Sequence, residues 1–149
     1  MVTLSTEQIK EIAGQLDCGF TCFLNRHNKE IISLRGDEDD FSGFDDEDAW
    51  AEDRKKIDDN PGDYYEFEKM GSGDSFSVME DFINTVDSVK VRKDLIYALN
   101  QKKPFRQFKY VIDNSGEYRE KWFDFKDKKM IEWVVAALAM INGKEEEDL

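Results

Sequence analysis

The chain has 149 residues and a formal net charge of −13, from 34 acidic and 21 basic side chains. This length is typical of one domain, and 11 Phe, 5 Tyr and 3 Trp predict a core rich in aromatic side chains. The negative charge argues against a general nucleic-acid binder or a binder of anionic membranes, because it repels phosphate groups. No stretch approaches the roughly 20 apolar residues of a membrane span, and the N-terminus lacks a signal-peptide pattern, so we expect a cytoplasmic protein.

The first half of the chain predicts a helix and three short strands. Ser5 and Gln8 fit a capping box at the start of a segment with apolar residues at helical spacing. Two β-favouring runs around a polar turn predict a hairpin, and an alternating run predicts a third strand. The helix is expected over residues 5–16 and the strands over residues 18–24, 30–34 and 63–68.

An acidic segment, residues 37–60, separates the second and third predicted strands. Residues 37–59 hold 12 acidic and 3 basic side chains. We expect the segment to be a loop, part of it disordered, with a short helix over residues 49–57. When it is aligned as a calcium-binding loop from Glu38, Ala49 occupies the twelfth position, which needs a bidentate carboxylate, so no EF-hand is predicted.

The second half of the chain predicts four helices and a short acidic tail over residues 143–149. Asp74 is expected to cap the first helix, Pro104 to open the third and Gly143 to end the fourth. The helices are expected over residues 76–86, 89–100, 104–112 and 117–141, and residues 126–129 are a candidate interruption of the last.

The order of these elements predicts the fold class. Strands that cluster early and helices that follow later are typical of an α+β protein rather than of an alternating parallel sheet. We therefore expect an N-terminal helix, a small antiparallel sheet of about three strands and a predominantly helical C-terminal half. Residues 1–142 are expected to form a single α+β domain.

The sequence contains no complete catalytic or metal-binding set. His27 is the only histidine and lies in the predicted hairpin turn, where a surface position is expected. Cys18 and Cys22 are too few for a zinc site and are expected to be small buried hydrophobic residues. Gly71 and Gly73 are interpreted as part of a capped turn. We expect no cofactor and no metal, and this absence favours a protein that is not an enzyme.

The most distinctive stretch is KKPFRQFKY at residues 102–110, in which basic and aromatic residues alternate. Such a pattern can bind nucleic acid through phosphate contacts and base stacking. The apolar spacing also fits an amphipathic helix whose rings, including Phe105, point into the core, and this interpretation is preferred. The candidate binding residues are Phe105, Arg106, Phe108, Lys109, Arg119 and Trp122.

Four segments of the second half resemble, in order and spacing, the bacterial uncharacterised protein family 0158. They are SFSVMEDFI (75–83), LIYAL (95–99), KPFRQFK (103–109) and REKWFDF (119–125), the last followed by Glu132 and Trp133. The resemblance implies a bacterial cytoplasmic protein with the family's architecture, but it implies no activity. It also suggests that Phe105, Arg106, Phe108, Lys109 and Trp122 act together, either as a buried framework or as the edge of a site.

Three functional hypotheses follow. The first is a small non-enzymatic binding or adaptor protein, whose acidic segment attracts a basic protein partner. The alternative is binding of single-stranded nucleic acid, such as RNA, through residues 90–129, although the net charge disfavours it. Residues 90–142 hold 12 basic and 7 acidic side chains. The third is an enzyme that uses carboxylates and a metal ion, with acidic residues brought together from separate segments.

Overall fold

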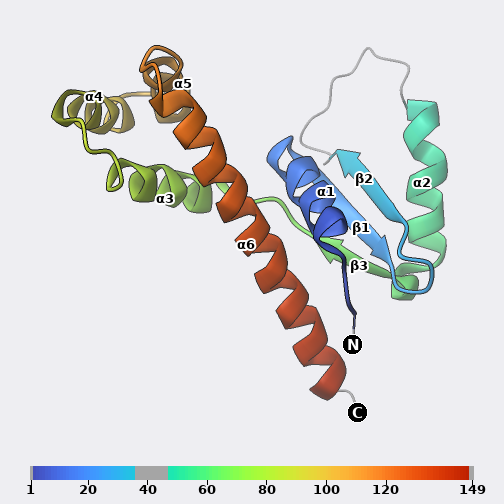
Figure 1. Ribbon diagram of the computed structural model, residues 1–149. Coiled ribbons are helices and arrows are strands. Elements are labelled where there is room, and N and C mark those ends of the chain that lie inside the picture. Colours follow the sequence, from blue (N-terminus) through green and yellow to red (C-terminus); the bar gives the residue numbers. More distant parts are fainter. Residues whose placement is uncertain (1, 36–46, 148–149) are drawn as a thin grey trace. The chain divides into compact units, whose positions relative to one another are not determined.

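The computed structural model describes residues 2–35 and 47–147, and the chain divides into two compact units. Unit 1 is formed by the chain up to Lys69 and from Met130 onward, and unit 2 by Met70–Lys129. The elements in chain order are α1 (Thr6–Asp17), β1 (Phe20–Asn25), β2 (Ile31–Arg35), α2 (Glu47–Asp59), the 3-10 helix η1 (Pro61–Asp63), β3 (Tyr64–Phe67), α3 (Ser72–Ile83), α4 (Val89–Leu99), α5 (Pro104–Asp113) and α6 (Tyr118–Glu147) (Figure 1).

The α+β prediction is confirmed, since a helix and a three-stranded antiparallel sheet precede a mostly helical second half. The strand order is β2-β1-β3, so β1 is the central strand. Phe23 of β1 lies opposite Ile32 on one side and Glu66 on the other. A central strand has neighbours on both edges and both faces, and the two fully buried side chains of β1, Cys22 and Leu24, reflect this position.

Helices α1 and α2 cover opposite faces of this sheet (Figure 1). On one face, the Cys22 Sγ lies 4.0 Å from the Ile12 carbonyl oxygen of α1. Phe23 points to the other face because side chains alternate along a strand. There it packs against the cluster of Ile32, Leu34 and Ile57, and Ile57 belongs to α2. The sheet and its two helices therefore form the core of unit 1.

The helix signal at the start of α1 is confirmed. The Gln8 backbone N–H donates to the Ser5 hydroxyl at 3.1 Å, and the Ser5 N–H donates to the Gln8 side chain at 2.9 Å. This is the predicted capping box, which satisfies two donors at the start of α1. Beyond the helix end, Gly19 has a φ of 93°, a conformation that glycine adopts without a steric penalty. Cys18 at the same helix end is exposed, so its predicted burial is wrong.

Helix α6 contributes residues 118–129 to unit 2 and residues 130–147 to unit 1. In unit 1, the Trp133 indole N–H donates to the Glu68 carbonyl oxygen at 2.8 Å. The Asn142 side chain accepts from the Val2 N–H at 2.7 Å and donates to the Val2 carbonyl at 3.1 Å. The helix continues through residues 126–129 and past Gly143. The predicted interruption and the predicted end at Gly143 are therefore wrong, since a glycine inside a helix lowers its stability by only about 1 kcal/mol.

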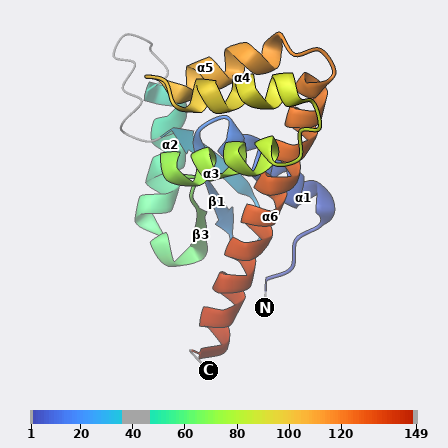
Figure 2. The same ribbon diagram turned by 90° about the vertical axis from the view of Figure 1, so that its left-hand side faces the viewer.

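Unit 2 is built around Trp122 of α6. Its ring lies edge-on to Phe82 of α3 and Phe108 of α5, with centroid distances of 5.2 and 4.8 Å. Phe125 packs against Phe82 at 5.4 Å. Helices α4 and α5 run beside each other over this core (Figure 2). Aromatic side chains therefore form the centre of unit 2, in agreement with the predicted aromatic-rich core.

The start of α3 differs from the prediction. Gly71, rather than Asp74, is the N-cap, and its carbonyl oxygen accepts the first helical hydrogen bond, from the Ser75 N–H at 3.0 Å. Asp74 instead lies in the first turn, where its negative charge still interacts favourably with the helix dipole. The apolar period shows where the inward face lies, but it does not show how many polar residues precede it within the helix.

Candidate functional site

Helix α4 is held in place by contacts at its start. The Tyr118 hydroxyl donates a hydrogen bond to the Asp87 carboxylate, directly before the N-cap Ser88. This hydrogen bond lowers the pKa of Asp87 and raises the pKa of Tyr118. Arg92 of α4 donates to the Ile83 and Asn84 carbonyl oxygens at 3.4 and 3.2 Å, at the end of α3. These contacts join the start of α4 to the end of α3 and to Tyr118 at the start of α6.

The connection between α4 and α5 contains a strained residue. Lys103 is the N-cap of α5 and has a φ of 56°, in the left-handed region. A residue with a Cβ pays roughly 1–2 kcal/mol for this conformation, and Pro104, which follows, restricts Lys103 further. The connection therefore holds Lys103 in this conformation at a cost in stability. Both residues are exposed.

Residues 90–109 carry a concentrated positive charge, with seven basic side chains and Asp94 as the only acidic one. Arg92 is engaged with α3, as described above. The other six are exposed, and they make no side-chain hydrogen bond, ion pair or ring contact within the described part of the chain. These six cations are Lys90, Lys93, Lys102, Lys103, Arg106 and Lys109.

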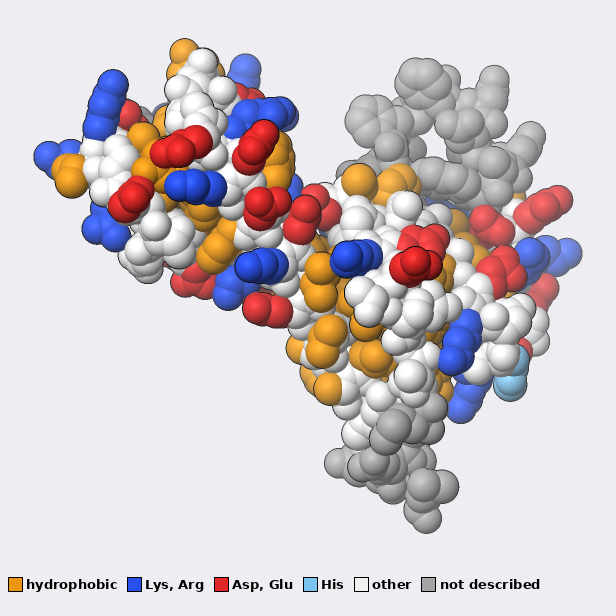
Figure 3. All heavy atoms as spheres, viewed as in Figure 1, with side chains coloured by type: hydrophobic (Ala, Val, Ile, Leu, Met, Phe, Trp, Pro, Cys, Tyr) orange, Lys and Arg blue, Asp and Glu red, His pale blue; other side chains and the backbone are white. Residues whose placement is uncertain are grey.

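Exposed aromatic rings lie among these cations. Tyr97 of α4 is 70 % exposed, and Phe105 and Tyr110 of α5 are 43 % and 69 % exposed. The predicted inward orientation of Phe105 is therefore wrong in large part. We call the six cations and the three rings the α4–α5 surface. Figure 3 shows Lys and Arg side chains projecting around this part of unit 2, with hydrophobic side chains exposed between them.

The six residues singled out from the sequence occupy different environments. Phe108 and Trp122 are buried in the core of unit 2. Arg106 and Lys109 are exposed, together with much of Phe105. Arg119 donates to the Asp113 carboxylate at 3.3 Å, and its guanidinium carbon lies 4.9 Å from the centre of the Phe123 ring. The structure thus brings Phe105, Arg106 and Lys109 to one outer surface and engages Arg119 in local contacts.

Sequence reasoning missed Tyr97 and Tyr110. Each lies two residues from a buried side chain, Tyr97 after Leu95 and Tyr110 after Phe108. Successive residues of a helix are rotated by about 100°, so a side chain two positions from a buried one points to nearly the opposite side. This angular relation was the available signal, although aromatic residues are often assigned to the core because they bury a large area there.

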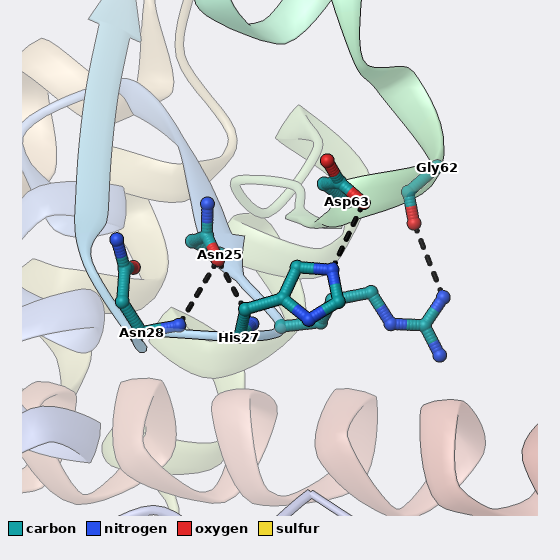
Figure 4. A network of polar contacts seen from close by, with 6 residues as sticks. Asn25, His27, Asn28, Gly62 and Asp63 are labelled. Atoms are coloured by element: carbon teal, nitrogen blue, oxygen red, sulfur yellow. Dashed lines mark hydrogen bonds and ion pairs between the residues drawn. The ribbon is translucent and has the colours of Figure 1, made fainter.

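The hairpin turn that contains His27 holds a second polar network (Figure 4). The Asn25 side chain accepts from the N–H groups of His27 and Asn28 at 2.8 and 3.1 Å. The His27 Nε2 lies 3.0 Å from the Asp63 carboxylate, and both side chains are substantially exposed. The predicted surface position of His27 is confirmed. These contacts join the β1–β2 turn to η1 and leave no nucleophile beside the imidazole in this network.

The described residues contain no group of three or more His, Cys, Asp or Glu side chains arranged to hold a metal ion. Cys22 is buried as predicted, and burial raises the pKa of its thiol. Residues 37–46 of the predicted acidic segment lie outside the described residues. The short helix predicted within it over residues 49–57 is confirmed as α2 (Glu47–Asp59). None of the helices in residues 2–35 and 47–147 is both long and apolar enough to cross a membrane.

Sequence comparison relates the chain to one known family. A stretch of 66 residues is 26 % identical to a UPF0158 protein of Pseudomonas aeruginosa, and it covers 44 % of this chain and 43 % of that relative. No solved structure shows a significant match to the chain. The model of the uncharacterised protein family UPF0158 matches residues 2–148. The chain therefore belongs to the UPF0158 family.

Proposed function

We propose that this protein is a non-enzymatic binding protein whose α4–α5 surface binds a negatively charged macromolecule. The observation that supports this proposal is the set of six exposed cations on α4, α5 and their connection without a described charge partner. Cations on a protein surface are commonly balanced by nearby acids. Here Asp94 is the only acid within residues 90–109, so the local field favours an anionic ligand.

The distribution of charge between the units explains how an acidic protein can bind an anion. Unit 2 contains 12 basic and 10 acidic residues, for a net charge of +2, whereas unit 1 contains 9 and 24, for −15. The net negative charge of the chain therefore comes from unit 1 alone. At physiological ionic strength, exposed charges more than about 8 Å apart are largely screened from each other. A ligand that contacts α4 and α5 thus responds mainly to charges within this range, and residues 90–109 supply seven basic side chains and one acidic side chain.

A pair of matched triple variants tests this proposal. Lys93→Gln, Arg106→Gln and Lys109→Gln remove three cations from the α4–α5 surface. Arg54→Gln, Lys55→Gln and Lys56→Gln remove the same residue types from α2 in unit 1. The two variants have equal net charge, so they separate the position of the charge from its total. Binding of fluorescein-labelled heparin, measured by fluorescence anisotropy over a range of salt concentrations, provides the readout.

We expect the α4–α5 variant to bind heparin at least about tenfold more weakly and with a shallower salt dependence, because fewer counterions are released on binding. The α2 variant is expected to bind as the wild type does. Equal loss in both variants, or no heparin binding by the wild type, would contradict the proposal. Attraction of a basic protein partner by residues 37–60 stays a prediction, and deletion of that segment followed by partner capture would test it.

A further inference from the structure

Resting on the proposed function, we infer that the anionic ligand of the α4–α5 surface is single-stranded nucleic acid. The six cations explain attraction to any polyanion, but they do not explain the exposed aromatic rings. Tyr97, Phe105 and Tyr110 keep between 43 % and 70 % of their surface in contact with water. Aromatic rings beside cations are typical of proteins that stack on unpaired bases while they neutralise phosphates.

The rings and cations are arranged in pairs. Lys93 and Tyr97, Phe105 and Lys109, and Arg106 and Tyr110 are each four residues apart on one helix. Side chains at this spacing lie on the same helix face. Each of the three rings therefore shares its face with a cation at the distance of one helical turn.

These paired groups remain available to a ligand. None of the three pairs forms a cation–π contact within the described residues, and none of the six side chains makes a hydrogen bond, ion pair or ring contact there. This differs from Phe123, whose ring already contacts the Arg119 guanidinium. A nucleotide presents a flat base and a phosphate, which match a ring and a cation on one face. Three such pairs on α4 and α5 offer contacts to several successive nucleotides.

Other anionic partners fit the surface less well. A duplex keeps its bases stacked on each other, so its phosphates can meet the cations while its bases cannot reach the rings. An acidic peptide has carboxylates for the cations but usually no planar group for each ring. An anionic membrane accepts cations and aromatic side chains together, but it favours a continuous apolar face at least as wide as the basic one. On α4, Leu95 and Ala98, which belong to the apolar face, are buried in the protein.

The inference is tested with four probes and three variants of the full chain. The probes are a fluorescein-labelled oligo-uridine of 20 nucleotides, a duplex of the same length, poly-glutamate, and vesicles that contain phosphatidylglycerol. The variants are the double variant Tyr97→Ala and Tyr110→Ala, the triple variant that removes Lys93, Arg106 and Lys109, and Phe123→Ala as a matched exposed-ring control. Thermal unfolding followed by circular dichroism checks that each variant folds.

We expect oligo-uridine to bind at least about tenfold more tightly than the duplex, poly-glutamate or the vesicles. The ring variant should lose tenfold or more for oligo-uridine, because each base stack contributes roughly that factor, and should retain its weaker binding to the duplex. Phe123→Ala should bind as the wild type does. Preference for the duplex, poly-glutamate or the vesicles would overturn the inference, as would an unchanged ring variant or an equal loss in Phe123→Ala.

These outcomes also separate the two proposals. If the cation variant loses binding to every probe while the ring variant is unaffected, the proposed polyanion binding stands and the assignment to single strands fails. If the wild type binds none of the probes, both fail. If the ring variant unfolds, Tyr97→Leu and Tyr110→Leu, which keep apolar bulk but remove the aromatic ring, give the same comparison.

Discussion

Phe105 and Phe108 provide a matched test of whether α5 has an outer, exposed face and an inner, buried face. They are the same residue type, three positions apart in one helix, but Phe108 is 2 % exposed and Phe105 is 43 % exposed. Phe108→Ala removes a fully buried ring and its contact with Trp122 at 4.8 Å. Truncation of a buried Phe costs about 3–5 kcal/mol in unfolding free energy. We therefore expect Phe108→Ala to cost at least 3 kcal/mol.

The expected cost for Phe105→Ala is much smaller. Burial of a complete Phe side chain contributes about 1.5–3 kcal/mol, and a little over half of this ring is buried. Alanine also has the higher helix propensity, by up to about 0.7 kcal/mol. The net loss is therefore about 1 kcal/mol or less. Urea denaturation, followed by far-ultraviolet circular dichroism, measures both variants, and equal losses would show that Phe105 is a core residue after all.

Three further predictions concern the backbone strain, the pH dependence and the N-terminal contact. Lys103→Gly should raise the unfolding free energy by about 0.5–1 kcal/mol, because glycine relieves the strain at positive φ but loses more backbone entropy. Tyr118→Phe should remove a stabilisation that is largest between about pH 4 and pH 10. The wild-type pKa of Asp87 lies below its ordinary 3.8, so this contribution is present above that value and is lost as pH falls through the lowered pKa. The pKa of Tyr118 lies above its ordinary 10.0, so its contribution is lost as pH rises through the raised pKa. Asn142→Ala should cost about 1–2 kcal/mol by removing two hydrogen bonds to the N-terminal backbone.

Each of these predictions has a control. Lys103→Ala keeps the positive φ and a Cβ, so a gain in stability equal to that of Lys103→Gly would contradict the strain. The difference in melting temperature between wild type and Tyr118→Phe should shrink at both pH extremes, and a difference that is constant with pH would contradict the effect of the Asp87 contact. Met140→Ala serves as the control for Asn142→Ala, since Met140 is 66 % exposed on the same helix. Comparable losses in those two variants would argue against the hydrogen-bonded contact.

Local patterns predicted most of the secondary structure because the physical causes are themselves local. The Ser5 capping box, the hairpin around residues 25–30 and Pro104 at the start of α5 all depend on residues a few positions apart. The predicted helix boundaries were wrong where the spacing of apolar residues was compatible with several first or last residues. Asp74 and Gly143 are the two examples, because a helix can extend through polar residues and through a glycine when the flanking turns are favourable.

The candidate surface was only partly predictable. The interleaving of basic and aromatic residues in residues 102–110 drew attention to α5, and Phe105, Arg106 and Lys109 are exposed on this helix. Phe108 and Trp122 share the same pattern in the sequence but form the core. A ring that binds a ligand and a ring that packs inside have the same composition and similar spacing. Their roles depend on which side of the helix meets the rest of the unit.

The sequence by itself determined the α+β class, the family and the presence of a basic segment in an acidic protein, since composition, periodicity and motif order carry that information. Only the tertiary structure decided which charges remain unpaired and which rings face solvent. Within residues 90–129, Arg119 contacts Asp113 and Phe123, and Arg92 contacts the end of α3, so these two cations are already engaged. Such pairings depend on which residues meet in the folded chain. The cations without such a partner and the exposed rings of α4 and α5 form the α4–α5 surface.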